Sequence, residues 1–213
     1  MNLLAHRGFW RDPAEKNGRA AFERALSEGY GIETDVRDMN GTVVISHEPP
    51  GHAGMTLDAL LELYITSKAR SCLALNVKAD GLQDLIRDRL RDFGIANYFL
   101  FDMSVPDLLR YFDNGLKVYT RRSEYEFASL LDEKAAGIWL DAFIKPFVNP
   151  TLLDHCLCDG RSVALVSPEL HGKTHAEAWE QWRKVIRKHA GRFVSVSLCT
   201  DIPDEAADFF SGC

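Results

Sequence analysis

Short apolar runs alternate with amphipathic segments eight times along the 213-residue chain, and this alternation limits the fold more than any other feature. The apolar runs predict strands at residues 3–6, 31–36, 72–78, 98–102, 117–120, 137–141, 161–167 and 193–199. The amphipathic segments predict helices at residues 18–28, 82–93, 124–133, 150–157, 175–189 and 203–210, with two more beginning at Thr56 and Ser104. Eight such units predict an α/β fold, a compact (β/α)8 TIM barrel formed as a single domain by residues 1–213. An open doubly wound sheet is the alternative, because it has the same periodicity.

Composition excludes several classes of function. The net charge of −6 and the lack of a basic stripe argue against a nucleic-acid partner. No apolar run is long enough for a transmembrane helix, so we expect no stable membrane insertion.

The first residues lack the features of a signal peptide, and five cysteines are an odd number, so we expect a cytoplasmic protein with reduced thiols. Cys156-Leu157-Cys158 has no second pair nearby, and we expect it to be incidental rather than a zinc site. Oligomeric state is left open.

Three polar clusters interrupt the first apolar segments: Ala5-His6-Arg7-Gly8, Ile32-Glu33-Thr34-Asp35-Val36, and Val43-Val44-Ile45-Ser46-His47-Glu48. The third lies on an extended segment, residues 42–47, after the Asn40-Gly41 turn signal.

Glu33 and Asp35 point to the same side of their strand, because side chains alternate between the two faces. Two neighbouring carboxylates repel each other unless a positive charge lies between them, and Mg²⁺ or Ca²⁺ prefers such oxygen ligands. An isolated E-x-D pattern is also common on solvent-facing edge strands. His6 and His47, which end two apolar segments, favour the functional interpretation, because paired imidazoles suit acid–base chemistry near pH 7.

These clusters, together with Ala20-Ala21-Phe22-Glu23-Arg24-Ala25, resemble the glycerophosphodiester phosphodiesterase family. The opening pattern of that family is H-R-G, an acidic-Asn turn, A-F-x-x-A, I-E-x-D-V and V-x-x-H-D, in this order. The resemblance covers the first 48 residues and continues weakly through Leu75-Asn76-Val77-Lys78 and residues 200–204. It implies a barrel of the phospholipase C-like phosphodiesterase type. It also implies metal-assisted hydrolysis of a small glycerophosphodiester to glycerol phosphate and an alcohol.

Polar residues recur at the carboxyl ends of the predicted strands, where the active site of a (β/α)8 barrel lies. We expect His6 and His47 to act as general acid and base, in an order that the sequence leaves open. Glu33 and Asp35, with Asn76 in the third metal position of the family, are the expected ligands of Mg²⁺ or Ca²⁺. The residues expected to bind substrate or its phosphate are Arg7, Lys78, Trp139, Glu169 and His171.

The chain departs from the family pattern at the third metal position. The family usually has Glu where this chain has Asn76, and Asn offers one neutral oxygen. Metal affinity should therefore fall, unless Asp102, Asp141 or Glu169 supplies the missing charge. Two smaller departures are Glu48, where the family has Asp, and Glu15-Lys16-Asn17, an acidic-Asn turn that is one residue longer.

Two other functions are alternatives to the hydrolysis of a soluble phosphodiester. A barrel without the third carboxylate could bind a phosphorylated ligand and no longer turn it over, although binding alone would not need two imidazoles. A phospholipase-like enzyme would act at membranes, but the sequence has no basic amphipathic helix to support that function.

Overall fold

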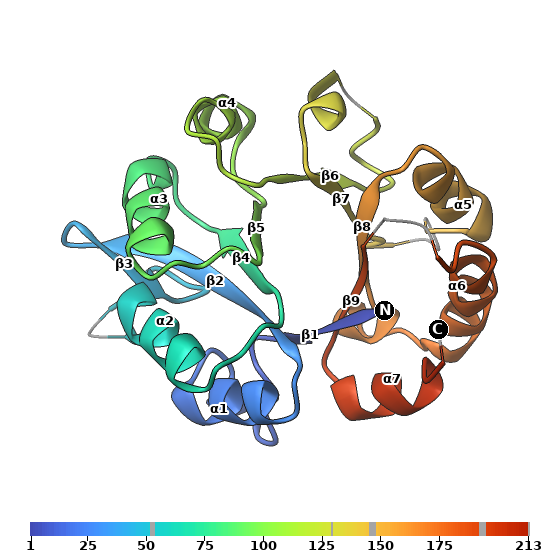
Figure 1. Ribbon diagram of the computed structural model, residues 1–213, viewed down its shortest axis with the longest axis horizontal. Helices are drawn as coiled ribbons and strands as arrows, with labels where there is room; N and C mark the ends of the chain where they lie inside the picture. The colour runs from blue at the N-terminus through green and yellow to red at the C-terminus, as the bar shows by residue number, and fades with distance from the viewer. Residues whose placement is uncertain (52–53, 129, 145–147, 192–194, 213) are drawn as a thin grey trace. The chain divides into compact units, whose positions relative to one another are not determined.

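Eight parallel strands, each followed by a helical segment, make up the computed structural model, which describes residues 1–51, 54–128, 130–144, 148–191 and 195–212 (Figure 1). The strand order is β5-β4-β2-β1-β9-β8-β7-β6, and β3 pairs with β2 outside this path. This is the strand–helix order of a (β/α)8 barrel, so the predicted fold class is confirmed. The chain divides into two compact units, Leu4–Val118 and Tyr119–Cys213, and the second also includes Met1–Leu3. A single domain therefore stays a prediction.

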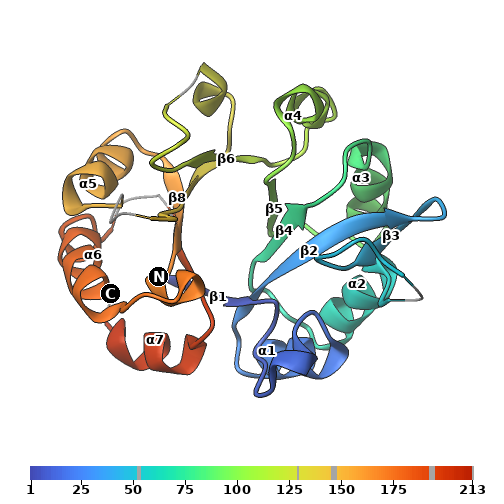
Figure 2. The same cartoon turned by 180° about the vertical axis from the view of Figure 1, so that it is seen from behind.

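The Leu4–Val118 unit carries the first polar clusters. Its strands are β1 (Asn2–His6), β2 (Gly31–Met39), β3 (Thr42–Ile45), β4 (Leu73–Val77) and β5 (Tyr98–Phe101). Its helices are the 3-10 helix η1 (Pro13–Glu15), α1 (Arg19–Ser27), α2 (Leu57–Thr66), α3 (Gln83–Asp92) and α4 (Val105–Asp113). Figures 1 and 2 show α1, α2 and α3 on the same side of β1, β4 and β5. The predicted apolar face of α1, including Phe22 and Leu26, is buried there.

Local sequence signals set several boundaries in this unit. The Thr56 hydroxyl accepts the N–H of Ala59 at 3.1 Å and begins α2, as a capping residue does. Asn40 and Gly41 have φ of 50° and 78°, as a tight hairpin turn requires. The hairpin extends β2 to Met39, beyond the predicted end at residue 36, because these added residues pair with β3. The strand after the turn ends at Ile45, two residues earlier than predicted.

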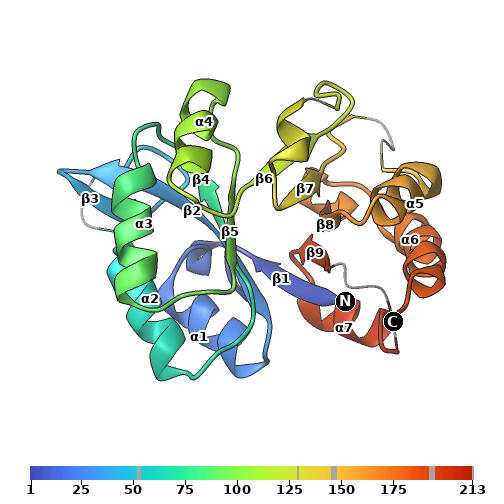
Figure 3. The ribbon, with the colours of Figure 1, turned by 45° about the horizontal axis from the view of Figure 1, so that its top comes forward.

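The Tyr119–Cys213 unit contains the remaining strands and helices (Figure 3). The strands are β6 (Tyr119–Arg122), β7 (Gly137–Leu140), β8 (Ser162–Val166) and β9 (Val196–Thr200). The helices are η2 (Leu130–Glu133), α5 (Pro150–Cys158), η3 (Pro168–His171), α6 (Ala176–Lys188) and α7 (Pro203–Phe209). Trp179 and Trp182 of α6 are buried, and their indole N–H groups each donate a 2.8 Å hydrogen bond within this unit. Both tryptophans therefore pack in the core of this unit.

The predicted helix over residues 124–133 is wrong, because among the described residues of this segment only Leu130–Glu133 are helical, as a 3-10 turn. Side-chain contacts hold the preceding residues in another conformation. The Glu124 carboxylate accepts the N–H groups of Phe143, at 3.1 Å, and of Ile144. The Glu126 carboxylate binds Arg121 Nε at 2.5 Å. In the strand predicted at 193–199, residues 193 and 194 lie outside the described residues.

Candidate active site

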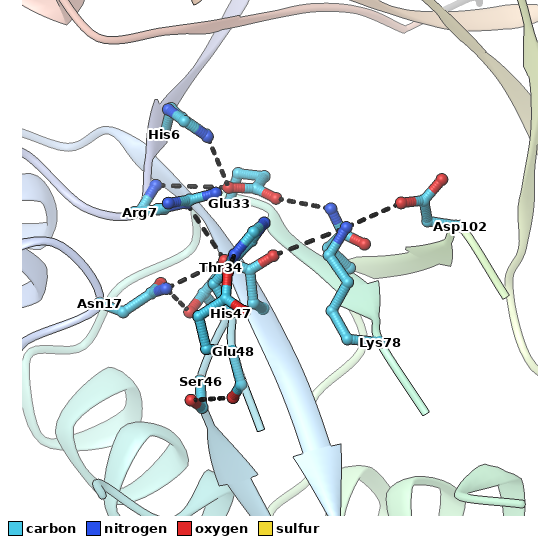
Figure 4. A network of polar contacts seen from close by, with 12 residues as sticks. His6, Arg7, Asn17, Glu33, Thr34, Ser46, His47, Glu48, Lys78 and Asp102 are labelled. Carbon is cyan, nitrogen blue, oxygen red and sulfur yellow. Dashed lines mark hydrogen bonds and ion pairs between the residues drawn. The ribbon is translucent and has the colours of Figure 1, made fainter. Parts of the chain in front are cut away.

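The register of three neighbouring strands aligns polar residues of β1, β2 and β4. β1 and β2 pair in parallel with His6 opposite Glu33, and β2 and β4 pair with Asp35 opposite Asn76. Figure 4 shows His6, Arg7, Lys78 and Asp102 around Glu33, which lies in the first half of β2. The strand spacing thus brings predicted site residues of three chain segments into one network.

Glu33 and Asp35 are both buried, with 2% and 1% of their surface exposed. Burying a carboxylate is unfavourable unless hydrogen bonds or positive charges compensate it. Asp35 has several such partners: Asn17 Nδ2 donates to Oδ2 at 3.0 Å, Arg7 Nε lies 3.2 Å from Oδ2, and Lys78 Nζ lies 3.9 Å from Oδ1. Asp35 is therefore well stabilised as a carboxylate.

Glu33 is less well compensated. Its Oε2 accepts the main-chain N–H of Arg7 at 3.3 Å and lies 3.9 Å from His6 Nε2. Burial raises the pKa of Glu33 to about 7, and the Asp35 charge acts in the same direction, while His6 opposes both. A cation bound beside Glu33 would lower this pKa, because it favours the charged carboxylate. Of the two carboxylates, Glu33 is therefore the one whose charge a bound metal would stabilise more.

A left-handed turn after β1 positions Arg7. Arg7 has φ of 56° and Gly8 has φ of 86°. A non-glycine residue in this region costs about 1–2 kcal/mol, and such strain is concentrated at functional sites. The turn directs the Arg7 N–H at both the main-chain oxygen, at 2.9 Å, and the Oε2 of Glu33. It also leaves the His6 carbonyl to accept the indole N–H of Trp10 at 3.2 Å.

Asn17 is a residue of this network that the site prediction omitted. It has φ of 58°, and besides its bond to Asp35 its Oδ1 accepts the Thr34 hydroxyl at 2.7 Å. Its main-chain N–H donates to the Arg7 carbonyl at 2.9 Å. The sequence signal that could have identified Asn17 was the acidic-Asn turn, Glu15-Lys16-Asn17. The acidic residue of that turn, Glu15, pairs with Arg24 at 3.0 Å instead of joining the site.

His47 lies beyond β3 and is held beside β2 by backbone contacts. The N–H of Ser46 donates to the Asp35 carbonyl at 3.0 Å, and the His47 carbonyl accepts Arg37 Nε at 2.9 Å. The imidazole is 41% exposed, and its Nδ1 lies 2.8 Å from Glu48 Oε1. In the neutral ring this contact favours the proton on Nδ1, which leaves Nε2 as the basic nitrogen.

Lys78 and Asn76 complete the network from β4. Lys78 Nζ donates to Asp102 Oδ2 at 2.9 Å, so Asp102 neutralises Lys78 and is connected to the Glu33–Asp35 pair through this lysine. Asn76 Nδ2 contacts Glu33 Oε1 at 3.4 Å. Among the described residues Asn76 Oδ1 is a buried acceptor without a hydrogen-bond partner. Two buried carboxylates and an unpaired amide oxygen are a donor set that fits a hard divalent cation.

The remaining predicted site residues lie in the Tyr119–Cys213 unit. His171 Nε2 lies 2.7 Å from Asp141 Oδ1, and the ring meets Phe143 edge-on at 5.2 Å. The Glu169 carboxylate accepts the Thr200 hydroxyl at 2.5 Å and the N–H of Asp201 at 3.3 Å. Glu169 thus joins the loop after β8 to the end of β9. Trp139 in β7 is 5% exposed. A role of Trp139, Glu169 and His171 in substrate binding stays a prediction.

Three solved phosphodiesterase structures have similar folds. A glycerophosphodiester phosphodiesterase from Agrobacterium tumefaciens superposes with a TM-score of 0.69 at 18% identity, covering 100% of both chains. The chain has the fold of glycerophosphodiester phosphodiesterases. An Oleispira antarctica phosphodiesterase in complex with the product sn-glycerol-3-phosphate gives 0.65 at 13% identity, covering 100% of this chain and 97% of that one. A glycerophosphoryl diester phosphodiesterase from Parabacteroides distasonis gives 0.66 at 14% identity, covering 99% and 86%.

The resemblance read from the first 48 residues is thus confirmed by similarity of fold. No protein-family model and no curated protein matches the sequence. None of the helices in the described part of the chain has the length and hydrophobicity needed to span a bilayer.

Proposed function

We propose that this chain is a cytoplasmic phosphodiesterase that hydrolyses a small glycerophosphodiester to glycerol phosphate and an alcohol with the help of Mg²⁺ or Ca²⁺. The observation that carries the proposal is the buried Glu33–Asp35 pair of β2, with His6, Arg7 and Lys78 around it. The fold shared with a phosphodiesterase that holds sn-glycerol-3-phosphate supports the same substrate class.

The metal would be held by Glu33, Asp35 and Asn76. When bound, it supplies positive charge that stabilises the negative charge developing on the phosphoryl oxygens. Arg7 and Lys78 lie beside the same carboxylates and would bind the phosphate directly. Asp102 positions Lys78 through its 2.9 Å ion pair.

The two histidines would move the protons. The resemblance implies that a substrate hydroxyl next to the phosphate attacks first, which gives a cyclic phosphate that water then opens. One imidazole removes the proton from that hydroxyl, and the other protonates the leaving alkoxide. Glu48 orients His47 through Nδ1, and Glu33 lies against His6 Nε2, so each imidazole has a neighbouring carboxylate that can stabilise its protonated form.

Hydrolysis of a panel of glycerophosphodiesters that differ in the alcohol tests this function. We expect release of glycerol phosphate from at least one substrate, loss of activity in chelator and recovery with Mg²⁺ or Ca²⁺. His6→Ala and His47→Ala should each lower kcat by about 10²–10⁴-fold, the usual contribution of a general acid or base. His155→Ala, at an exposed histidine of α5, is the matched control. Full activity of metal-depleted protein, or near-normal kcat of both histidine variants, would contradict the mechanism.

Asn76 favours one second candidate, a barrel that binds a phosphorylated ligand without turnover. Such a protein would bind glycerol phosphate, measured by calorimetry, and release no product from any member of the panel. Sedimentation with liposomes separates both candidates from an enzyme that acts on membrane lipids.

A further inference from the structure

A second group of potential ligand atoms lies in the Tyr119–Cys213 unit, remote in sequence from the proposed active-site residues. Asp154, Cys158 and His189 each offer one ligand atom, and these atoms lie within 4.8 Å of one another. Asp154 and Cys158 are four residues apart on α5 and so share one face of that helix. His189 is the capping residue that directly follows α6. In the sequence Cys158 is only half of a C-x-C pair, and neither Asp154 nor His189 lies at a spacing that marks a zinc motif with it.

The histidine of this group is oriented toward the aspartate. His189 is 6% exposed, and its Nε2 lies 2.6 Å from Asp154 Oδ1. Within the described part of the chain its Nδ1 is buried and has no hydrogen-bond partner. In a Cys–His–Asp nucleophile relay the thiol and the carboxylate would occupy opposite ring nitrogens. Here the thiol does not engage Nδ1, so convergence on a shared ion fits the geometry better than a relay.

The group is accessible and its carboxylate is ionised. Cys158 is exposed at the end of α5. Hydrogen bonds from His189 and Lys188 lower the pKa of Asp154 to about 2, so it offers a carboxylate at neutral pH. Lys188 Nζ lies 2.9 and 3.1 Å from the two Asp154 oxygens, but its side chain is 65% exposed and can turn into solvent.

We propose that Asp154, Cys158 and His189 bind a zinc ion that joins α5 to the end of α6. One sulfur, one nitrogen and one oxygen ligand are the donor types that Zn²⁺ takes, and a water would complete the tetrahedron. Binding requires the thiolate and an imidazole nitrogen without a proton. It therefore releases the thiol proton to solvent, leaves the proton of neutral His189 on Nδ1 instead of the Nε2 that faces Asp154, and moves the Lys188 ammonium away from Asp154. The site is independent of the phosphodiesterase proposed above, whose Glu33, Asp35 and Asn76 offer only oxygens.

Cobalt is the probe, because a thiolate bound to Co²⁺ gives a charge-transfer absorption band in the near ultraviolet that oxygen ligands do not give. Titration of metal-free protein should give this band with about one Co²⁺ per chain, and Zn²⁺ should displace it. Cys158→Ser should abolish the band, and His189→Gln should weaken Zn²⁺ binding by at least about tenfold. His155→Gln removes a histidine of the same helix outside the group and should change neither.

Lys188→Gln gives the sharper test, because it removes the cation that competes for Asp154 and should tighten Zn²⁺ binding several-fold. A general loss of structure could not produce that gain. Circular dichroism of the metal-free variants checks folding, and the exposed position of Cys158 keeps its Ser variant informative if His189→Gln unfolds. No thiolate band in the native protein, a band that persists in Cys158→Ser, or weaker binding in Lys188→Gln would overturn the proposal.

Discussion

Two carboxylates only two residues apart have different electrostatic surroundings in this protein. Asp35 accepts a hydrogen bond from Asn17 and lies near Arg7 and Lys78, whereas Glu33 has one main-chain donor, a long amide contact and His6. The spacing of the pair was readable from the sequence, because strand alternation is local. The difference between them was not, because it depends on residues brought in by β1, β4 and the turn at Asn17.

The raised pKa of Glu33 predicts a pH dependence of stability in metal-free protein. In the unfolded chain the group titrates near 4.5, and in the folded state near 7. Between these values the folded state binds more protons than the unfolded state, so the contribution of Glu33 to stability falls as pH rises from about 4.5 to about 7. Urea unfolding across this range should show wild type losing stability relative to Glu33→Gln as pH rises. A difference between the two that is constant with pH would contradict the assignment.

Asn76→Glu tests the third metal position. A carboxylate here would lie beside Glu33, where the present amide contact is 3.4 Å. Without metal, like charges should destabilise the folded state at pH 8, whereas a bound cation should reverse the effect. We therefore expect a lower Tm in chelator and a larger Tm increase with Mg²⁺ or Ca²⁺ than in wild type. Asn76→Gln, which adds length without charge, is the control. Unchanged or weaker metal stabilisation of Asn76→Glu would remove residue 76 from the ligand set.

At the scale of elements, the turn after β1 depends on glycine for two separate reasons. Gly8 has φ of +86°, and a Cβ there would come within 2.8 Å of the Ala21 Cβ on α1. Gly29, which follows α1, has φ of +78° and nothing within 4 Å of such an atom. Gly29→Ala should thus cost about 1–2 kcal/mol of unfolding free energy from its backbone alone. Gly8→Ala should cost roughly 1–3 kcal/mol more, because the extra methyl overpacks the contact with α1. Equal losses of unfolding free energy in Gly8→Ala and Gly29→Ala, measured with urea, would show that α1 moves away from the added methyl group at no cost.

The elements that sequence predicted correctly are those fixed by local signals. Thr56 caps α2, and Asn40-Gly41 makes the hairpin turn. The segment 124–133 failed because Glu124 and Glu126 bind groups outside any helix of their own, including main-chain N–H groups of Phe143 and Ile144. A helical pattern reports only the contacts of the segment itself, so it is overridden where such distant partners compete.

At the scale of the whole molecule, similarity of fold persists at an identity of 18%. The arrangement of strands and helices is therefore shared although most residues differ. A substitution such as Asn76 can therefore change the charge of a site without any change in the pattern that specifies the fold. The fold alone does not determine the reaction, which depends on the side chains at the site. The histidine and Asn76 variants test the chemistry of those side chains.

The division into two units raises the question of whether the chain unfolds in one step. The first strand belongs to both units, with Met1–Leu3 in one and the remainder in the other, so neither can unfold without losing strand pairs of β1. We therefore expect a single cooperative transition, as for one domain. Trp10→Phe removes the tryptophan of the Leu4–Val118 unit and leaves Trp139, Trp179 and Trp182 as reporters of the other.

In Trp10→Phe, fluorescence follows the Tyr119–Cys213 unit alone, while far-ultraviolet circular dichroism follows the helices of both units. For a single domain the urea midpoints of the two signals should coincide, and the circular dichroism midpoint should stay close to that of wild type. The wild-type comparison is needed because the variant loses the hydrogen bond from the Trp10 indole to the His6 carbonyl. Two separated midpoints would show that the units unfold independently, and the chain would then consist of two domains despite its shared first strand.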